Sequence, residues 1–305
     1  MKWKLLILFI LVSVFLLSVI NLDGLIASQE KSYPENSKNI EESKEELEGE
    51  PIVFILSGQS NMVGYGTPDN LIEKNLLAIS DNVDFYYVDS SDYSLRMIDS
   101  IEDEKYSNEV RFGPEISLIH KLAEDYPNQK VIIIKFGVGG SSISNWSPGV
   151  NYYELIRHIR TVVQDYSIVE YGGLFWFQGE DDTRPLNEDY LSMTKEMFEQ
   201  VRIDLNASDM PFFMGKIHPG TGDCPWANDT IIENIVQVRE WQGQMESEME
   251  KVYVTDGQGL SCFDNDAIHF NTESLVELGY LFGDVYDDYL TDVSNSDASL
   301  VSIII

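Results

Sequence analysis

Short apolar runs alternate with amphipathic stretches over most of the chain. The apolar runs are rich in β-branched and aromatic residues, which is typical of buried strands. They cover Ile52–Leu56, Val83–Val88, Val131–Phe136, Gly173–Phe177, Phe212–Ile217 and Val252–Thr255. Apolar residues recur at helical spacing in the stretches Pro114–Tyr126, Tyr153–Val163, Glu188–Val201, Ile231–Met249 and Ser274–Leu290. This alternation predicts a mostly parallel sheet with crossover helices, and therefore a three-layer α/β/α sandwich.

The amino-terminal end of the chain departs from this pattern. Lys2 and Lys4 precede a continuous apolar run from Leu5 to Ile20. At about 1.5 Å per residue, a helix of this run is shorter than the roughly 30 Å hydrocarbon core of a bilayer, and its length suits the apolar part of a secretion signal. We expect residues 1–27 to be a signal peptide or an uncleaved N-terminal membrane anchor. In both cases the rest of the chain is secreted or otherwise lies outside the cytoplasm.

The remaining segments differ in composition. Residues 28–50 are polar and acidic, which predicts a disordered linker. A single domain is expected over residues 51–290, and residues 291–305 form a C-terminal tail that fits no predicted element. The two cysteines, Cys224 and Cys262, would form one disulfide in an exported chain, and two free thiols fit the sequence equally well.

The net charge narrows the classes of partner. The chain has 305 residues, with 20 Lys and Arg residues against 52 Asp and Glu residues, a formal charge of −32. Such a field repels a phosphate backbone, so no nucleic-acid partner is expected. It also slows the approach of anionic substrates and so favours a neutral one. Solubility and adaptation to high salt account for the acidity equally well.

Four segments that follow predicted strands carry side chains suited to acyl transfer. The first is Gly58-Gln59-Ser60-Asn61-Met62, a polar turn directly after a strand. A serine held there on rigid backbone is open to the crevice in which α/β sheets bind ligands. The segment differs from the G-x-S-x-G elbow of α/β-hydrolases because position 62 is Met. By itself it is also compatible with an ordinary strand-to-helix turn.

The second segment is the glycine-rich stretch Phe136–Ser142, in which a free backbone N–H could point at a developing oxyanion, and a tight turn that needs positive φ fits it at least as well. Its spacing does not match a dinucleotide-binding fingerprint. The third is Trp176–Asp182, where the Gln178 amide could complete an oxyanion hole and Glu180 could share that pocket. Its three carboxylates lack suitably spaced His or Cys residues, so no metal site is expected.

The fourth segment, Asp266-Ala267-Ile268-His269, supplies a base. A separation of three residues lets a carboxylate and an imidazole meet within one turn of loop or helix. Asp266 could then orient His269 toward the nucleophile, as in a Ser-His-Asp triad. Among the four histidines of the chain, His218 is the rival base because it also follows a strand. A nucleophile, oxyanion donors and an acid–base pair on one sheet edge together predict a serine esterase.

The combined motifs resemble the SGNH-hydrolase superfamily, in particular carbohydrate esterase family 6 and the sialate O-acetylesterase-type domain. The matching residues run from about 51 to 270 and are Gly58–Met62, Gly113-Pro114-Glu115, Gly139-Gly140-Ser141 with Trp146, Trp176-x-Gln178-Gly179-Glu180-x-Asp182, and Asp266-x-x-His269. The resemblance implies a flavodoxin-like fold and hydrolysis of O-acetyl esters on carbohydrates, such as acetylxylan or acetylated sialic acid, without metal or cofactor.

The resemblance also assigns roles to residues. Ser60 would be the nucleophile and His269 the base, with Asp266 or Glu180 as the triad acid. The oxyanion hole would comprise the N–H groups of Ser60 and Gly140 and the side chain of Gln178. Substrate contacts would come from Gln59, Asn61, Trp146 and Asp182, and Trp226 is a further aromatic residue that could stack on a sugar. Two other functions fit the same scaffold, a non-catalytic carbohydrate-binding protein and a general lipid or acyl esterase.

Overall fold

The computed structural model describes residues 47–106, 109–225 and 227–303. Residues 1–27 and most of the predicted linker lie outside this part, so the export segment and the linker stay predictions. Among the described residues, no helix combines the length and apolar character needed to cross a bilayer.

Seven strands form a central sheet in the order β3-β2-β6-β1-β7-β8-β9. All six predicted strands are present and parallel, and β3 is an additional edge strand antiparallel to β2. The bounds are β1 Ile52–Gly58, β2 Val83–Asp89, β3 Ser94–Ile98, β6 Val131–Gly137, β7 Glu170–Phe177, β8 Phe212–Lys216 and β9 Val252–Asp256. Two short antiparallel pairs complete the strands, β4 (Lys105–Tyr106) with β5 (Glu109–Val110) and β10 (Cys262–Phe263) with β11 (Asp266–Phe270).

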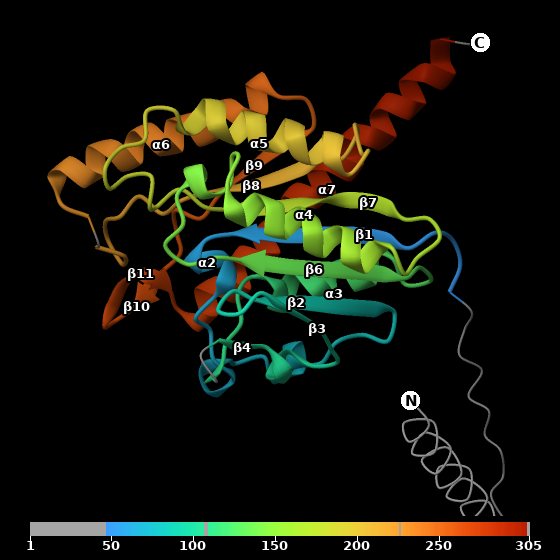
Figure 1. The fold of residues 1–305 in the computed structure, drawn as a ribbon, viewed down its shortest axis with the longest axis horizontal. Helices are drawn as coiled ribbons and strands as arrows, with labels where there is room; N and C mark the ends of the chain where they lie inside the picture. The colour runs from blue at the N-terminus through green and yellow to red at the C-terminus, as the bar shows by residue number, and fades with distance from the viewer. Residues whose placement is uncertain (1–46, 107–108, 226, 304–305) are drawn as a thin grey trace, which may run out of the picture. The chain divides into compact units, whose positions relative to one another are not determined.

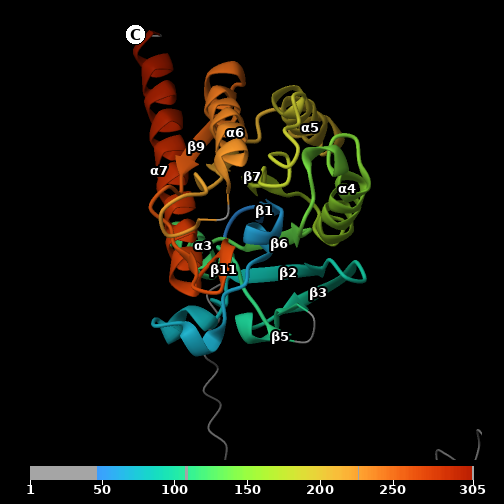
Figure 2. The ribbon, with the colours of Figure 1, turned by 90° about the vertical axis from the view of Figure 1, so that its left-hand side faces the viewer.

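Helices cover both faces of the sheet, which confirms the three-layer architecture. On one side lie α4, α5 and α6, and on the other α3 and α7 (Figures 1 and 2). Their bounds are α3 Glu115–Asp125, α4 Val150–Val163, α5 Tyr190–Asp204, α6 Asp229–Glu248 and α7 Thr272–Ile303. Central strand β1 is buried on both faces, with Phe54 in one hydrophobic core and Ile55 in the other.

The structure differs from the sequence-based expectation at the carboxyl end. Residues 291–303 are not a separate tail, because α7 continues without interruption to Ile303. No Gly or Pro follows Gly283 in this region, so no helix-breaking residue stops the helix. The edge strand β3 was not predicted because it is short and half polar, and its Arg96 and Met97 face solvent.

Candidate active site

Three neighbouring strands, β6, β1 and β7, end at the same edge of the sheet, and each leads into one of the expected site segments. Gly58, the last residue of β1, pairs with Gly137 of β6 and Phe177 of β7. Gly58 has a φ of +150°, and a Cβ there would lie 2.0 Å from the carbonyl oxygen of Phe177. Only glycine therefore allows the strands to approach this closely just before the serine turn.

Ser60 begins α2 (Ser60–Val63), a single helical turn at the carboxyl end of β1 (Figure 1). The residue is 6% exposed. The glycine turn after β6 lies beside it, since a Cβ built on Gly139 would be 3.8 Å from the Cβ of Ser60. Gly140 is exposed and has a φ of +63°, with no atom within 4 Å of its Cβ position. The first two segments are therefore adjacent.

His269 is held by Asp266 on β11. The His269 Nδ1 and Asp266 Oδ2 atoms are 2.6 Å apart, and Asp266 Oδ1 also accepts hydrogen bonds from the backbone N–H groups of Ile268 and His269. Burial acts to raise the pKa of Asp266, but the hydrogen bond and charge of His269 outweigh it and hold that pKa below its usual range. Asp266 is therefore ionised at neutral pH and can orient the imidazole. The pair lies on a strand rather than in the loop or helical turn that its spacing suggested.

Asn61 connects the strand of His269 to the turn that contains Ser60. Its Nδ2 donates to the carbonyl oxygen of Ile268 at 3.3 Å, and its Oδ1 accepts from the N–H of Phe270 at 3.0 Å. These bonds flank His269 on both sides and fix its strand against the residue next to Ser60. Helix α2 and β11 contact each other at one end of the sheet (Figure 1).

A disulfide fixes the other strand of the hairpin. Cys224 and Cys262 are bonded, with their Cα atoms 5.0 Å apart. Cys262 begins β10 and pairs with Phe270 of β11, the residue that follows His269. The cross-link and Asn61 together hold the hairpin that carries His269.

Glu180, the other carboxylate considered for the triad, contacts Asn61 instead. Its Oε1 accepts from Asn61 Nδ2 at 2.8 Å, and its Oε2 is buried without a hydrogen-bond partner in the described part of the chain. Burial raises the pKa of Glu180 to about 7, although the hydrogen bond from Asn61 acts in the opposite direction. Of the two candidate acids, Asp266 is thus the one hydrogen-bonded to His269.

Gln59, Gln178 and Asp182 form a buried hydrogen-bonded cluster beneath the site, and each is at most 2% exposed. Gln178 Nε2 donates to Asp182 Oδ2 at 2.5 Å and to the Ser141 carbonyl oxygen at 3.0 Å. Gln59 Oε1 accepts from the N–H of Gly179 at 3.1 Å. The side-chain polar atoms of Asn61 and Asp182, and Oε1 of Gln59, bind protein in this structure, so their expected contacts with substrate stay predictions. The amide hydrogens of Gln178 also have protein acceptors, so this arrangement does not support its oxyanion role.

Trp146 does not face a ligand either. It is 0% exposed, its Nε1 donates to Ser141 Oγ at 2.9 Å, and its ring meets Trp176 edge-on at 5.1 Å between centroids. The expected stacking of this ring on a sugar is therefore wrong, because core packing covers the ring. Trp226 lies outside the described residues.

The rival base His218 is buried, and its Nδ1 accepts a hydrogen bond from the N–H of Gly220 at 3.1 Å. Burial and the charge of Arg239 lower its pKa. Among the described residues no carboxylate accepts a hydrogen bond from it, in contrast to His269. No group of three His, Cys, Asp or Glu side chains in the described part is placed to hold a metal ion.

Sequence reasoning missed two features near the site. The ring of Tyr65 stacks on the ring of His269, with centroids 4.1 Å apart and an interplanar angle of 22°. Behind α2, the buried ammonium of Lys135 lies 2.6 Å from Glu104 Oε1 and 2.7 Å from Glu115 Oε2. Lys135 also donates to the carbonyl oxygen of Val63, the last residue of α2. A lysine inside the apolar run of β6 was the sequence signal for this cluster, whereas nothing marked Tyr65.

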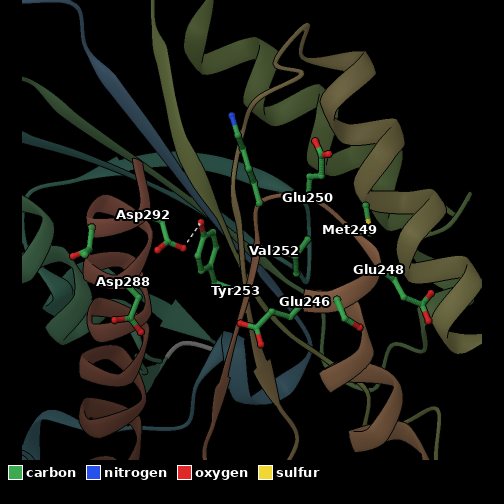
Figure 3. Close-up of a pocket in the computed structure, with 11 residues that line it drawn as sticks. Glu246, Glu248, Met249, Glu250, Val252, Tyr253, Asp288 and Asp292 are labelled. Atoms are coloured by element: carbon green, nitrogen blue, oxygen red, sulfur yellow. Dashed lines mark hydrogen bonds between the residues drawn. The ribbon is translucent and has the colours of Figure 1, made fainter. Parts of the chain in front are cut away.

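A wide pocket lies away from these residues, between the end of α6, the start of β9 and α7 (Figure 3). Its walls are acidic, with Glu246, Glu248, Glu250, Asp288 and Asp292 among the lining residues. Tyr253 donates a 3.3 Å hydrogen bond to Asp292 across it (Figure 3). Because β9 begins here, the pocket is at the sheet edge opposite Ser60 and contains none of the expected site residues.

Comparison with known proteins identifies the family of the chain. Residues 51–288 match the family model described as carbohydrate esterase, sialic acid-specific acetylesterase. A probable carbohydrate esterase of Arabidopsis thaliana is 25% identical over 255 residues, which cover 77% of this chain and 89% of that protein.

Solved structures share the fold. The crystal structure of an Arabidopsis thaliana protein has a TM-score of 0.61 at 21% identity, and covers 78% of this chain and 98% of that one. The structure of NanS has a TM-score of 0.60 at 15% identity, and covers 80% of this chain and 98% of that one. With the family match spanning the whole described sheet and the Ser60 and His269 segments, the chain belongs to the sialic acid-specific acetylesterase family of carbohydrate esterases and is a hydrolase of carboxylic ester bonds.

Proposed function

We propose that this enzyme removes O-acetyl groups from glycans through an acetyl-serine intermediate on Ser60. One observation carries the serine mechanism: an imidazole oriented by a carboxylate at 2.6 Å is tied, through Asn61, to the turn that presents Ser60. A nucleophile beside a base that is itself oriented by a third group is the general arrangement of serine hydrolases. Family membership supports the acetylated carbohydrate as substrate.

The reaction would proceed in two steps. His269 Nε2 takes the proton of the Ser60 hydroxyl, and Ser60 Oγ forms a bond with the acetyl carbonyl carbon. The tetrahedral intermediate collapses when its bond to the sugar oxygen breaks and the imidazolium gives its proton to that oxygen. A water molecule, deprotonated by His269, then attacks the acetyl carbon; the bond from this carbon to Ser60 Oγ breaks, the imidazolium returns its proton to Ser60, and acetate leaves. Asp266 stays ionised throughout and stabilises the imidazolium.

Backbone N–H groups would stabilise the oxyanion. Ser60 occupies the first position of α2, where a helix leaves N–H groups without intrahelical acceptors. Gly140 lies in the exposed turn beside it. Donors of this kind, fixed by the backbone before the charge develops, typically contribute about 10²–10³ in kcat each.

The proposal covers both acetylxylan-type and sialate-type substrates, and the charge of the chain favours the neutral glycan. Sialic acid is itself an anion, and a protein of formal charge −32 slows its approach, most strongly at low salt. We also propose that residues 1–27 direct export, so that the glycan substrate lies outside the cytoplasm.

Acetate release from acetylated xylan and from O-acetylated sialic acid, measured at low and high salt, tests the substrate. Ser60→Ala should lower kcat on p-nitrophenyl acetate by about 10⁴-fold or more and abolish labelling by an organophosphonate. Wild-type protein that binds acetylated glycan but releases no acetate would favour the non-catalytic alternative. Activity that rises from acetyl to longer acyl esters would favour a lipid or general acyl esterase.

The triad acid is tested by comparing Asp266→Asn with Glu180→Gln. Because Asp266 holds His269 at 2.6 Å, its replacement should cost about 10²-fold or more in kcat, whereas Glu180→Gln keeps an acceptor for Asn61 and should cost far less. A larger loss in Glu180→Gln than in Asp266→Asn would reverse the assignment.

A further inference from the structure

Tyr65 lies in the segment that follows α2, and its ring covers one face of the His269 imidazole. The two rings are stacked, with 4.1 Å between centroids and 22° between planes. The motifs of the sequence assign no role to Tyr65, and the inference drawn from this contact rests on the proposed function of His269.

Tyr65 is itself held in place on its remaining sides. Its ring meets the ring of Tyr106, on β4, at 6.0 Å and close to edge-on. Its carbonyl oxygen accepts a 3.1 Å hydrogen bond from Arg111. Burial, followed by the neighbouring Tyr106, raises the pKa of Tyr65, so the ring remains a neutral phenol while His269 changes protonation state. The stack therefore offers a fixed, uncharged aromatic face.

The charged groups around the stack come from several elements. Asp266 on β11 faces His269 Nδ1 at 2.6 Å. The guanidinium of Arg111 lies 5.9 Å from the Tyr65 ring centroid and is paired with Glu109 at 2.6 Å. Glu180 accepts a hydrogen bond from Asn61, whose side chain binds the backbone of Ile268 beside His269. Asp266 is thus the one carboxylate in contact with the imidazole among the described residues, and the face toward Tyr65 carries no charge of its own.

We infer that Tyr65 is a positioning residue for the general base: it fixes the plane of the His269 ring and stabilises the imidazolium through its aromatic face. The hydrogen bond to Asp266 holds one ring atom at 2.6 Å and still tolerates some rotation about the Cβ–Cγ bond of His269, which would change the direction of Nε2. The face of a tyrosine ring attracts a positively charged imidazolium more strongly than it attracts a neutral imidazole. Since the imidazolium forms during attack by Ser60, this attraction is stronger in the transition state than in the ground state and lowers the barrier.

Three variants of the full chain separate the aromatic face from simple packing. Tyr65→Phe keeps the aromatic ring over the imidazole and serves as the matched control. Tyr65→Leu keeps an apolar side chain over the imidazole but removes the aromatic ring. Tyr65→Met replaces the leucine variant if that variant does not unfold cooperatively. The His269 ring is titrated by NMR, with its signals assigned by their loss in His269→Gln, and kcat and KM on p-nitrophenyl acetate are measured against pH.

In Tyr65→Leu, the proton affinity of the His269 ring should fall by about 2- to 30-fold, so that its titration midpoint and the acidic limb of kcat/KM both move to lower pH. In the same variant kcat should fall by a similar factor with KM little changed, and Tyr65→Phe should resemble the wild type. An unchanged or raised midpoint in Tyr65→Leu, or an equal loss in Tyr65→Phe, would overturn the inference. The NMR titration needs no turnover, so it remains decisive even if the wild-type protein proves inactive on acetyl esters and the proposed function fails.

Discussion

Replacing Lys135 with Met should strongly destabilise the domain. The ammonium is 0% exposed and lies 2.6 Å from Glu104 and 2.7 Å from Glu115, and its removal leaves two buried carboxyl groups without a cation. Breaking a buried ion pair in this way typically costs about 3–5 kcal/mol. The hydrogen bond to the Val63 carbonyl oxygen, 2.8 Å long, is lost as well. For a domain of this size the loss corresponds to a fall in Tm of very roughly 10 °C.

The stability lost in Lys135→Met should depend on pH. Burial and the negative charge of Glu115 already raise the pKa of Glu104 well above its usual range, with Lys135 acting in the opposite direction. Without Lys135 the pKa of Glu104 in the folded state rises further. The folded state then holds a proton that the unfolded state releases, so the stability of the variant falls as pH rises above about 4.5. The difference in the free energy of unfolding between the wild type and Lys135→Met should therefore be smallest at acidic pH and largest near neutral pH.

Urea unfolding at pH 4.5 and 7.5 measures this effect, with Lys130→Met as the matched control. Lys130 pairs with Asp84 at a similar distance, 2.9 Å, but both side chains are 25% exposed, and its loss should cost less than about 1 kcal/mol. Adding Glu104→Gln and Glu115→Gln to Lys135→Met should recover part of the loss, because no buried charge remains. A Lys135→Met variant that loses under about 1 kcal/mol at pH 7.5, or the same amount at both pH values, would refute the reasoning.

Two further predictions concern the disulfide and the buried Glu180. Replacing both Cys224 and Cys262 with Ser removes a cross-link across 38 positions and should lower the free energy of unfolding in urea by about 4 kcal/mol. The value of kcat should also fall, because the hairpin of His269 gains freedom. Unchanged stability of this variant would contradict the prediction. Burial raises the pKa of Glu180 from 4.5 to about 7, so the wild-type fold should lose about 3 kcal/mol of stability as pH rises through that range. Glu180→Gln should lack this decline, and identical pH profiles for the two proteins would show that Glu180 is not its source.

The layered fold could be predicted because the central strands β1 and β6 are buried on both faces. Continuous apolar runs such as Val131–Phe136 follow directly from that burial. The edge strand β3 and the extension of α7 could not be predicted in the same way. Arg96 and Met97 are exposed, so β3 shows no apolar run, and α7 beyond residue 290 lacks the stop signal that would have defined its end.

The site was predictable at the level of segments and less so at the level of side chains. A polar turn after a buried strand indicates where Ser60 lies, because parallel strands end together. The sequence does not distinguish a side chain that faces the crevice from one that supports the loop beneath it. Oε1 of Gln59 and the polar atoms of Asn61 and Asp182 hydrogen-bond to protein, and these bonds became visible only in the structure.

The hydrogen bond from Phe270 to Asn61 spans 209 positions. During synthesis the turn that contains Ser60 therefore leaves the ribosome long before His269. Strand β1 also precedes β6 and β7, its partners on either side, and can pair only after they are synthesised. A nascent or prematurely terminated chain that ends before His269 contains Ser60 but lacks the base that we propose for it. Under the proposed mechanism, the site would be completed in one late event, the docking of the β10–β11 hairpin, and chains that end before it would lack esterase activity.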